Sequence, residues 1–494
     1  MKKINKLLIS LTSSLLVAGN VLAIGSCGGS TVSGVNTGDV HAVAYDGSKV
    51  TIKFYHCMGA ALQTILNDAI KEFNTYYPNI EVLHTSYGDY PGVRDQITKE
   101  LKAGIAPSLA YCYPDHVALY QKQKAVLDLD EHIASTEMVT RADGTTEQMG
   151  LTQAQIDDYV PFYYEEGKMY GDGKMYTLPM LKSTELMYYN KTYFEENNLE
   201  IPEIWTWDYV EETCEKILEI ESAKEGGLKA NPCYPLGYDS GANWFITMTE
   251  QLKSGYTTNE KGNYFTFDNE TNRAFVERFR GWYQKGYVTT EEIFGSYTSD
   301  LFTQTDKSKT KIFMCIGSSA GATYQTPDPL QDKSYPFEVG VAMIPQSNPE
   351  EPKMISQGPS ICLFKKENDQ ETAAAWLFSK FITSTVEYQA RFSMNNGYTC
   401  AIQSVKDAPV YASFLNKADG GAYLQASAVK LTMDFKNYYF VSPAFVGSSA
   451  ARDEMALLMQ YCFQKTPASG KTATDLIKSE FETSLKALQR KYDK

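Results

Sequence analysis

The fold is decided early in the chain, by residues 49–73, which read KVTIKFYHCMGAALQTILNDAIKEF. The first seven residues alternate in the way that a β-strand requires. Apolar residues then recur at spacings of three and four, which places them on one stripe of a helix: Leu62, Ile65, Leu66, Ala69, Ile70 and Phe73. A strand followed at once by an amphipathic helix indicates an α/β fold.

The same alternation continues along the chain. Strands are predicted at 80–83, 186–189, 311–316 and 360–364, and helices at 93–101, 207–220 and 372–381. Strands that alternate with helices form a mostly parallel sheet flanked by helices. Because 494 residues are too many for one compact core, we expect two lobes, each with its own sheet.

The N-terminus has the layout of an export signal. Three lysines within the first six residues precede an apolar run from residue 7 to residue 23. Polar residues interrupt this run, and it is shorter than the roughly 20 apolar residues that a membrane-spanning helix needs. The run therefore predicts export.

The export signal ends in Ile24-Gly25-Ser26-Cys27, which resembles a bacterial lipobox. The resemblance implies that residues 1–26 are a lipoprotein signal peptide and that the thiol of Cys27 is lipidated. Two acyl chains give the stable anchoring that a single chain does not. Residues 27–47 contain few bulky side chains, and we predict that they form a flexible tether.

Charge and cysteine content exclude further classes. The formal net charge of −14 repels phosphate backbones, so a nucleic-acid partner is not expected. Nine cysteines are present, and none forms a CxxC pair. In a chain with ample core, scattered cysteines of this kind are typical small buried residues, although the sequence leaves their pairing open.

One segment has the form of a catalytic motif. Residues 317–321 read GSSAG, a literal GxSxG directly after a predicted buried strand. A hydrolase with such a nucleophile elbow carries its histidine later in the chain, and all five histidines precede Ser319. Zinc spacings, calcium loops and phosphate loops are also missing from the sequence. We therefore expect no enzyme, no metal and no cofactor.

Tyrosine is abundant, with 35 copies, many of them beside Gly, Pro, Ser or Asn in predicted loops. Examples are GDYP at 88–91, GYDSGANW at 237–244 and NGY at 396–398. Aromatic rings offer flat apolar faces on which sugars and polyols stack, while neighbouring polar groups bind the hydroxyls. This pattern favours a small polyhydroxylated ligand.

Several segments together resemble the family 1 extracellular solute-binding proteins of carbohydrate ABC importers. The most specific is LPMLKSTELMYYNK at 178–191, which PEIWTW follows at 202–207. The resemblance implies a two-lobed, periplasmic-binding-protein-like fold of type II, in which the chain crosses between lobes several times. The first lobe would then comprise residues 48–181 and 353–385, and the second 182–352 and 386–494. A monomer that works with an ABC permease is expected.

Within the family, the arrangement is most similar to glycerol-3-phosphate-binding proteins. Their ligand contacts correspond here to Tyr90, Ser183, Ser318 or Ser319, Gly358, Tyr398 and Arg452, with Trp244 near a family aromatic position. The family's acid for glycerol hydroxyls corresponds to Pro114, and Asp115 one position later is included in its place. A guanidinium such as that of Arg452 suits bidentate phosphate binding. Lys182 either adds positive charge to the site or is a solvated surface lysine.

The sequence leaves the identity of the ligand open. A phosphorylated, glycerol-like solute is favoured by Arg452 and Ser183, and a neutral oligosaccharide is favoured by the tyrosines and the displaced acid. A surface adhesin that uses the same scaffold without transport is a further alternative. In each case, the predicted location is the extracellular face of the cell membrane, reached through the lipid anchor.

Overall fold

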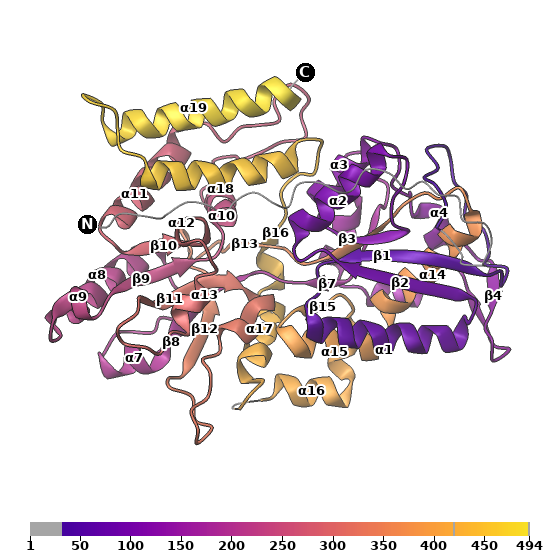
Figure 1. Ribbon diagram of the computed structural model, residues 1–494, viewed down its shortest axis with the longest axis horizontal. Coiled ribbons are helices and arrows are strands. Elements are labelled where there is room, and N and C mark those ends of the chain that lie inside the picture. Colours follow the sequence, from indigo (N-terminus) through magenta and orange to yellow (C-terminus); the bar gives the residue numbers. More distant parts are fainter. Residues whose placement is uncertain (1–31, 418–419, 493–494) are drawn as a thin grey trace, which may run out of the picture. The chain divides into compact units, whose positions relative to one another are not determined.

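The computed structural model describes residues 32–417 and 420–492 (Figure 1). Cys27 and the predicted export signal lie outside the described residues. Among the helices of the described ranges, none combines the length and the apolar composition that a membrane crossing needs. Two five-stranded sheets form the framework of the fold.

The first sheet has the strand order β2-β1-β3-β14-β6. Its strands are β1 (Val50–His56), β2 (Ile80–Ser86), β3 (Leu109–Cys112), β6 (Thr177–Pro179) and β14 (Ser360–Leu363). Strand β1 pairs in parallel with β2 and β3, whereas β14 pairs antiparallel with β3 and β6. Because β14 comes from far along the chain, this sheet is built from two separate pieces of sequence.

The second sheet has the order β10-β9-β11-β8-β12. Its strands are β8 (Glu185–Asn190), β9 (Cys233–Tyr238), β10 (Val288–Thr290), β11 (Lys311–Ser318) and β12 (Val339–Met343). Strand β9 pairs in parallel with β10 and β11, and β8 pairs antiparallel with β11 and β12. Strand β8 is buried on both faces, which explains the uninterrupted apolar sequence of its central residues 186–189.

Helices pack on the two faces of each sheet. In the first sheet, Phe54 belongs to one hydrophobic cluster and its neighbour Tyr55 to another, because successive strand residues point to opposite faces. The longer helices are α1 (Ala60–Tyr76), α2 (Tyr90–Lys102), α3 (Pro114–Gln121), α8 (Trp207–Ala223), α10 (Gly241–Gln251), α11 (Glu270–Gln284), α14 (Asp369–Ser384), α15 (Val386–Asn396), α16 (Pro409–Leu415), α17 (Tyr423–Asp434), α18 (Ser448–Gln464) and α19 (Ala473–Tyr492).

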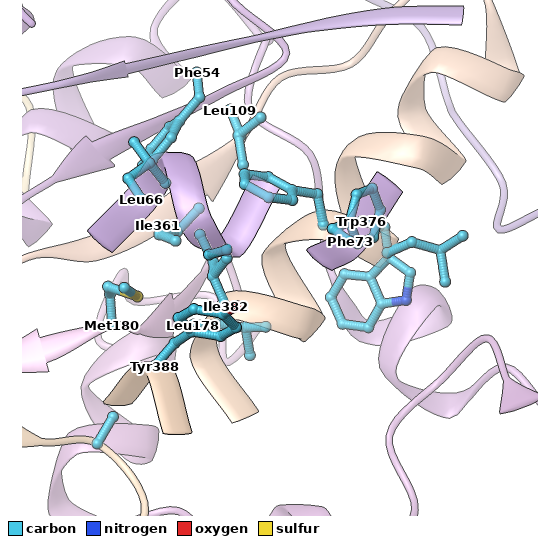
Figure 2. Packing of buried hydrophobic residues seen from close by; sticks show 14 of the residues in the cluster. Phe54, Leu66, Phe73, Leu109, Leu178, Met180, Ile361, Trp376, Ile382 and Tyr388 are labelled. Atoms are coloured by element: carbon cyan, nitrogen blue, oxygen red, sulfur yellow. The ribbon is translucent and has the colours of Figure 1, made fainter. Parts of the chain in front are cut away.

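Helix α1 confirms the stripe predicted from the sequence. Leu62, Ile65, Leu66, Ala69 and Phe73 are all buried. In Figure 2, Leu66 and Phe73 of α1 lie in one cluster with Phe54 of β1 and Trp376 of α14. The same cluster includes Tyr388 of α15, which the sequence assigned to the second lobe. The exact lobe boundaries stay a prediction.

The structure differs from the predicted flexible tether over residues 33–46. The backbone N–H and hydroxyl of Ser33 donate to Glu371, and Val35 forms an antiparallel bridge with Lys366. Tyr45 is buried and packs edge-on against Tyr77. Backbone hydrogen bonds and one aromatic anchor thus hold a segment whose composition alone indicates disorder.

The chain passes between the sheets through short paired segments. Strand β7 (Leu181–Lys182) pairs with β15 (Thr399–Cys400), and β13 (Met354–Ile355) pairs with β16 (Tyr439–Phe440). Ser183 forms an isolated bridge with Gln357, so two of the passages run side by side. The bridge brings together parts of the chain that lie far apart in sequence.

Replacing Leu66, which is fully buried, with alanine should lower the free energy of unfolding by about 2–5 kcal/mol, because apolar contacts are lost and a cavity remains. Leu83 on β2 is 45% exposed and provides the matched control, since L83A should change stability by less than about 1 kcal/mol. Urea denaturation of both variants measures the difference. Equal losses would contradict the assigned packing of α1.

Candidate functional site

A cavity of about 870 Å³ lies between loops of the two sheets. The first sheet contributes the turns after β1, β2 and β3, and the second contributes the turns after β9 and β11 together with the start of β8. Open α/β sheets bind ligands at the carboxyl ends of their strands. The cavity lies at that position for both sheets.

Tyrosines form much of the cavity lining. Tyr90 and Tyr113 stack with ring centroids 4.2 Å apart, and the hydroxyls of Tyr90 and Tyr398 lie 3.4 Å apart. Tyr297 and Tyr324 line the cavity as well and are 57% and 66% exposed. Exposed rings inside a cavity are available for stacking on the face of a ligand.

The charged lining is entirely acidic. Six carboxylates face the cavity, those of Asp89, Glu185, Asp239, Glu291, Asp300 and Asp328. Within the described ranges, no lysine, arginine or histidine contributes to the lining. The cavity is therefore electrostatically unfavourable for an anion unless the solute brings its own counter-charge.

Glu185 is a buried member of this acidic lining. It is 2% exposed, and its carboxylate accepts hydrogen bonds from the hydroxyl of Tyr238 at 2.7 Å and from the amide of Asn243 at 3.1 Å. Burial raises the pKa of Glu185 to about 7, and these two hydrogen bonds offset part of the increase. Burial likewise raises the pKa of Asp239 to about 6.

Four of the residues predicted from the sequence line the cavity together: Tyr90, Ser183, Ser318 and Tyr398. The turn before Tyr398 requires glycine, because Gly397 has a φ of +100° and a Cβ there would lie 2.4 Å from the carbonyl oxygen of Ser319. This close approach places Tyr398 beside the segment that follows β11.

Asp115, Gly358 and Arg452 line a second, smaller cavity of about 40 Å³. Tyr113 and Gln357 line both cavities, so the two spaces are neighbours. The Arg452 guanidinium donates to Oδ1 of Asn243 at 2.6 Å, and its Nε lies 3.7 Å from the Asp115 carboxylate. Arg452 is thus already engaged by protein groups behind the lining of the large cavity.

The structure does not bring Trp244 or Ser319 to the cavity surface. Trp244 is fully buried between Tyr238 and Phe279, at centroid distances of 4.9 and 4.3 Å. Ser319 is also fully buried, and its Oγ accepts a hydrogen bond from the backbone N–H of Thr184. The hydroxyl therefore joins the residue before β8 to the segment after β11.

The sequence model of the family described as bacterial extracellular solute-binding protein matches residues 68–417. This chain belongs to that family. The sn-glycerol-3-phosphate-binding periplasmic protein UgpB of Rhizobium meliloti is 23% identical over 392 residues, which cover 75% of this chain and 79% of the relative. The two-lobed α/β fold predicted from the sequence is confirmed by the solved structures that this solute-binding protein resembles.

Two such structures illustrate the likeness. UgpB of Mycobacterium tuberculosis in complex with glycerophosphocholine has a TM-score of 0.67 and 17% identity, covering 90% of this chain and 98% of that one. An ABC substrate-binding protein of Listeria monocytogenes in complex with cycloalternan also gives a TM-score of 0.67 at 17% identity, covering 89% and 99%. At this identity, the likeness concerns the fold alone.

Lys182 of the solute-binding protein takes neither of the roles considered from the sequence. Its side chain is fully buried, and Nζ donates to Glu166 at 2.7 Å and to Ser360 at 3.0 Å. Glu166 is nearly as buried, with 4% of its side chain exposed. The lysine therefore forms an internal ion pair at the passage between the sheets.

Sequence reasoning missed several residues that line the cavity, among them Tyr113, Asp239, Glu291 and Tyr297. Tyr297 follows Gly295-Ser296, the loop context already associated with ligand tyrosines, so a signal was available. Asp239 lies within the GYDSGANW segment, of which only Trp244 was selected. Glu291 gives no signal, because acidic pairs are common in this chain.

Replacing Glu185 with glutamine should change how stability depends on pH. The folded protein holds the Glu185 pKa near 7, against 4.5 for an unperturbed glutamate, so its contribution is complete below about pH 4.5 and disappears as pH rises through 7. The free energy of unfolding of the parent should therefore fall relative to E185Q over this range, by about 1.4 kcal/mol for each unit of pKa difference.

Urea denaturation at fixed pH values between 4 and 8 measures this change. The exposed Glu219 on α8 provides the control, because E219Q removes the same charge from a solvated position. A difference between parent and E185Q that stays constant with pH would contradict the assigned burial of Glu185.

Proposed function

We propose that this protein captures a small polyhydroxylated solute in the cavity of about 870 Å³ and presents it to an ABC permease. The cavity carries the proposal, because loops from both sheets line it and its volume falls in the range of about 300–1,000 Å³ that small-molecule sites occupy. A solute that contacts both sheets favours the closed arrangement of the lobes over the open one.

The chemistry of the lining supports a carbohydrate. Tyrosine rings provide faces for sugar rings, and carboxylate, amide and hydroxyl groups provide partners for sugar hydroxyls. Ser183, Asn243 and Gln357 place such polar groups together, with Asn243 and Gln357 joined by hydrogen bonds of 3.0 and 3.2 Å. Selective binding of polar ligands depends on partners held in fixed positions in this way.

Transport requires no covalent step at this site. A binding protein acts through the difference in ligand affinity between its open and closed states, which a hinge connects. The paired segments at Ser183 and Gln357 are suited to that role, since they lie where the chain passes between the sheets. Ser319, the serine of the GxSxG segment, is buried, and its hydroxyl accepts a hydrogen bond from the backbone of Thr184. This arrangement supports a function without catalysis.

The charge of the lining favours a solute without net negative charge. A phosphorylated, glycerol-like solute is the second candidate, supported by the names of the UgpB relatives and by the presence of Arg452 near the cavity. To bind phosphate, Arg452 would have to exchange its hydrogen bond to Asn243 for the ligand. The acidic lining opposes this exchange.

The location is proposed from the N-terminal sequence together with family membership. Family members are extracellular solute-binding proteins, and an export signal followed by Cys27 supports attachment to the outer face of the cell membrane. We propose a lipid-anchored monomer whose partner is a membrane permease.

Glucose, maltose, maltotriose, sorbitol and glycerol 3-phosphate form a suitable first panel for thermal melting and calorimetry. At least one neutral sugar should raise the melting temperature, because a ligand at 100 times its Kd stabilises the folded state by about 2.7 kcal/mol. Tyr113→Ala should weaken that binding about tenfold or more through loss of the stacked pair with Tyr90.

Tyr461→Ala is the matched control, because Tyr461 is an exposed tyrosine on α18 that does not line the cavity. If only glycerol 3-phosphate raised the melting temperature, a phosphorylated, glycerol-like solute would become the favoured ligand in place of a neutral sugar. A panel in which no compound changes the melting temperature would count against carbohydrate capture.

Cys27→Ser should release the protein from the membrane into the soluble fraction, because the substitution removes the thiol that would carry the lipid. Fractionation of cells that express the full chain, combined with metabolic labelling by a fatty acid, measures the effect. Label that persists in the Cys27 variant would place the lipid elsewhere.

A further inference from the structure

One corner of the cavity gathers three carboxylates from three separate segments. Asp89 precedes α2, Asp239 follows β9, and Glu291 begins the short helix α12 (Glu291–Phe294). Burial, followed by the charges of Glu292, Asp239 and Asp89, raises the pKa of Glu291 to about 7. We call Asp89, Asp239 and Glu291 the acidic corner.

Protein groups satisfy this corner only in part. Oδ1 of Asp239 accepts hydrogen bonds from the backbone and hydroxyl of Thr298, both at 2.7 Å, and Oδ1 of Asp89 accepts one from Gly92. Across residues 32–417 and 420–492, the Glu291 carboxylate has no hydrogen-bond or ion-pair partner. Charges in partly buried sites are normally paired, so this carboxylate points to a missing counter-charge.

A buried amide provides a second, independent indication. Gln325 is 1% exposed and lines the cavity, and its Nε2 donates to Cys315 Sγ at 3.3 Å, whereas its carbonyl Oε1 is buried without a partner in the described chain. A Cβ built on Gly317 would lie 2.7 Å from Asp239 Oδ2 and 3.0 Å from Gln325 Nε2, so the Asp239 and Gln325 side chains lie close together. An unpaired buried acceptor is costly unless a ligand supplies a donor.

The cation of the neighbouring small cavity does not neutralise the corner. Arg452 lies in the neighbouring small cavity, where Asn243 and Asp115 engage its guanidinium. Tyr297, by contrast, lines the same cavity with a ring that is 57% exposed. An electron-rich ring beside uncompensated carboxylates is a typical setting for an organic cation.

We propose that the solute carries a positively charged nitrogen, a protonated amine or a quaternary ammonium, which binds in the acidic corner beside Gln325 and Tyr297. The inference rests on the proposed capture of a small solute and specifies its charge. An ammonium N–H would donate to the carboxylates and to the unpaired Gln325 carbonyl, and the Tyr297 ring would contact the cation through its face.

Two matched ligand pairs test the charge directly: D-glucosamine against D-glucose, and choline against its neutral isostere 3,3-dimethyl-1-butanol. Calorimetry on the exported chain at pH 7 and low ionic strength should show that the cation of at least one pair binds about tenfold or more tightly than its neutral partner. The preference should decrease as salt is added, because the interaction is electrostatic.

Glu291→Gln should reduce the preference several-fold, because it removes one charge from the acidic corner while the Glu291 side chain has no hydrogen-bond partner among the described residues that the fold would lose. Glu219→Gln, an equal loss of charge on the solvated face of α8, should leave the preference unchanged. The inference would be overturned by any of three results: equal affinities within both ligand pairs, no binding of either cation, or binding of calcium ions in the acidic corner instead.

If the neutral sugars still bound, the proposed capture of a carbohydrate would remain supported although the inferred positive charge of the solute would be wrong.

Discussion

The ion pair between Lys182 and Glu166 lies where the chain leaves the first sheet for the second. A buried ammonium without a partner would cost several kcal/mol, so Lys182 must stay beside Glu166 and Ser360. That requirement fixes the passage segment, and the bridge between Ser183 and Gln357 aligns the returning passage beside it. Glu185 follows Ser183 by two residues, and the fixed passage segment therefore holds it in the lining of the cavity.

The cavity combines an aromatic wall with acidic side chains. Tyr90, Tyr113 and Tyr398 form an aromatic wall, and their positions depend on turns such as the one at Gly397. The carboxylates form the acidic part of the lining, and burial raises the pKa of Glu185, Asp239 and Glu291. Together these features support the proposal of a solute that has hydroxyl groups and positive charge and no net negative charge.

Much of the fold was predictable from local patterns. The strand at 49–55 and the helical stripe from Leu62 to Phe73 were recognisable because burial of one face imposes a period on the sequence. The antiparallel strands β8 and β14 were found as strands, but their partners were not, since pairing depends on where distant segments return. Residues 33–46 show the same limit, because their order comes from Glu371 and Lys366, far along the chain.

The sequence by itself determined an α/β chain, its family membership and four of the residues that line the cavity: Tyr90, Ser183, Ser318 and Tyr398. Those features are local, so short stretches of residues carry them. Only the tertiary structure decided that Trp244 belongs to the core, that Arg452 is held by Asn243, and that Glu291 lines the cavity with no side-chain partner among the described residues. Charge and exposure at a site depend on side chains that converge from distant segments, and no single stretch of sequence contains that information.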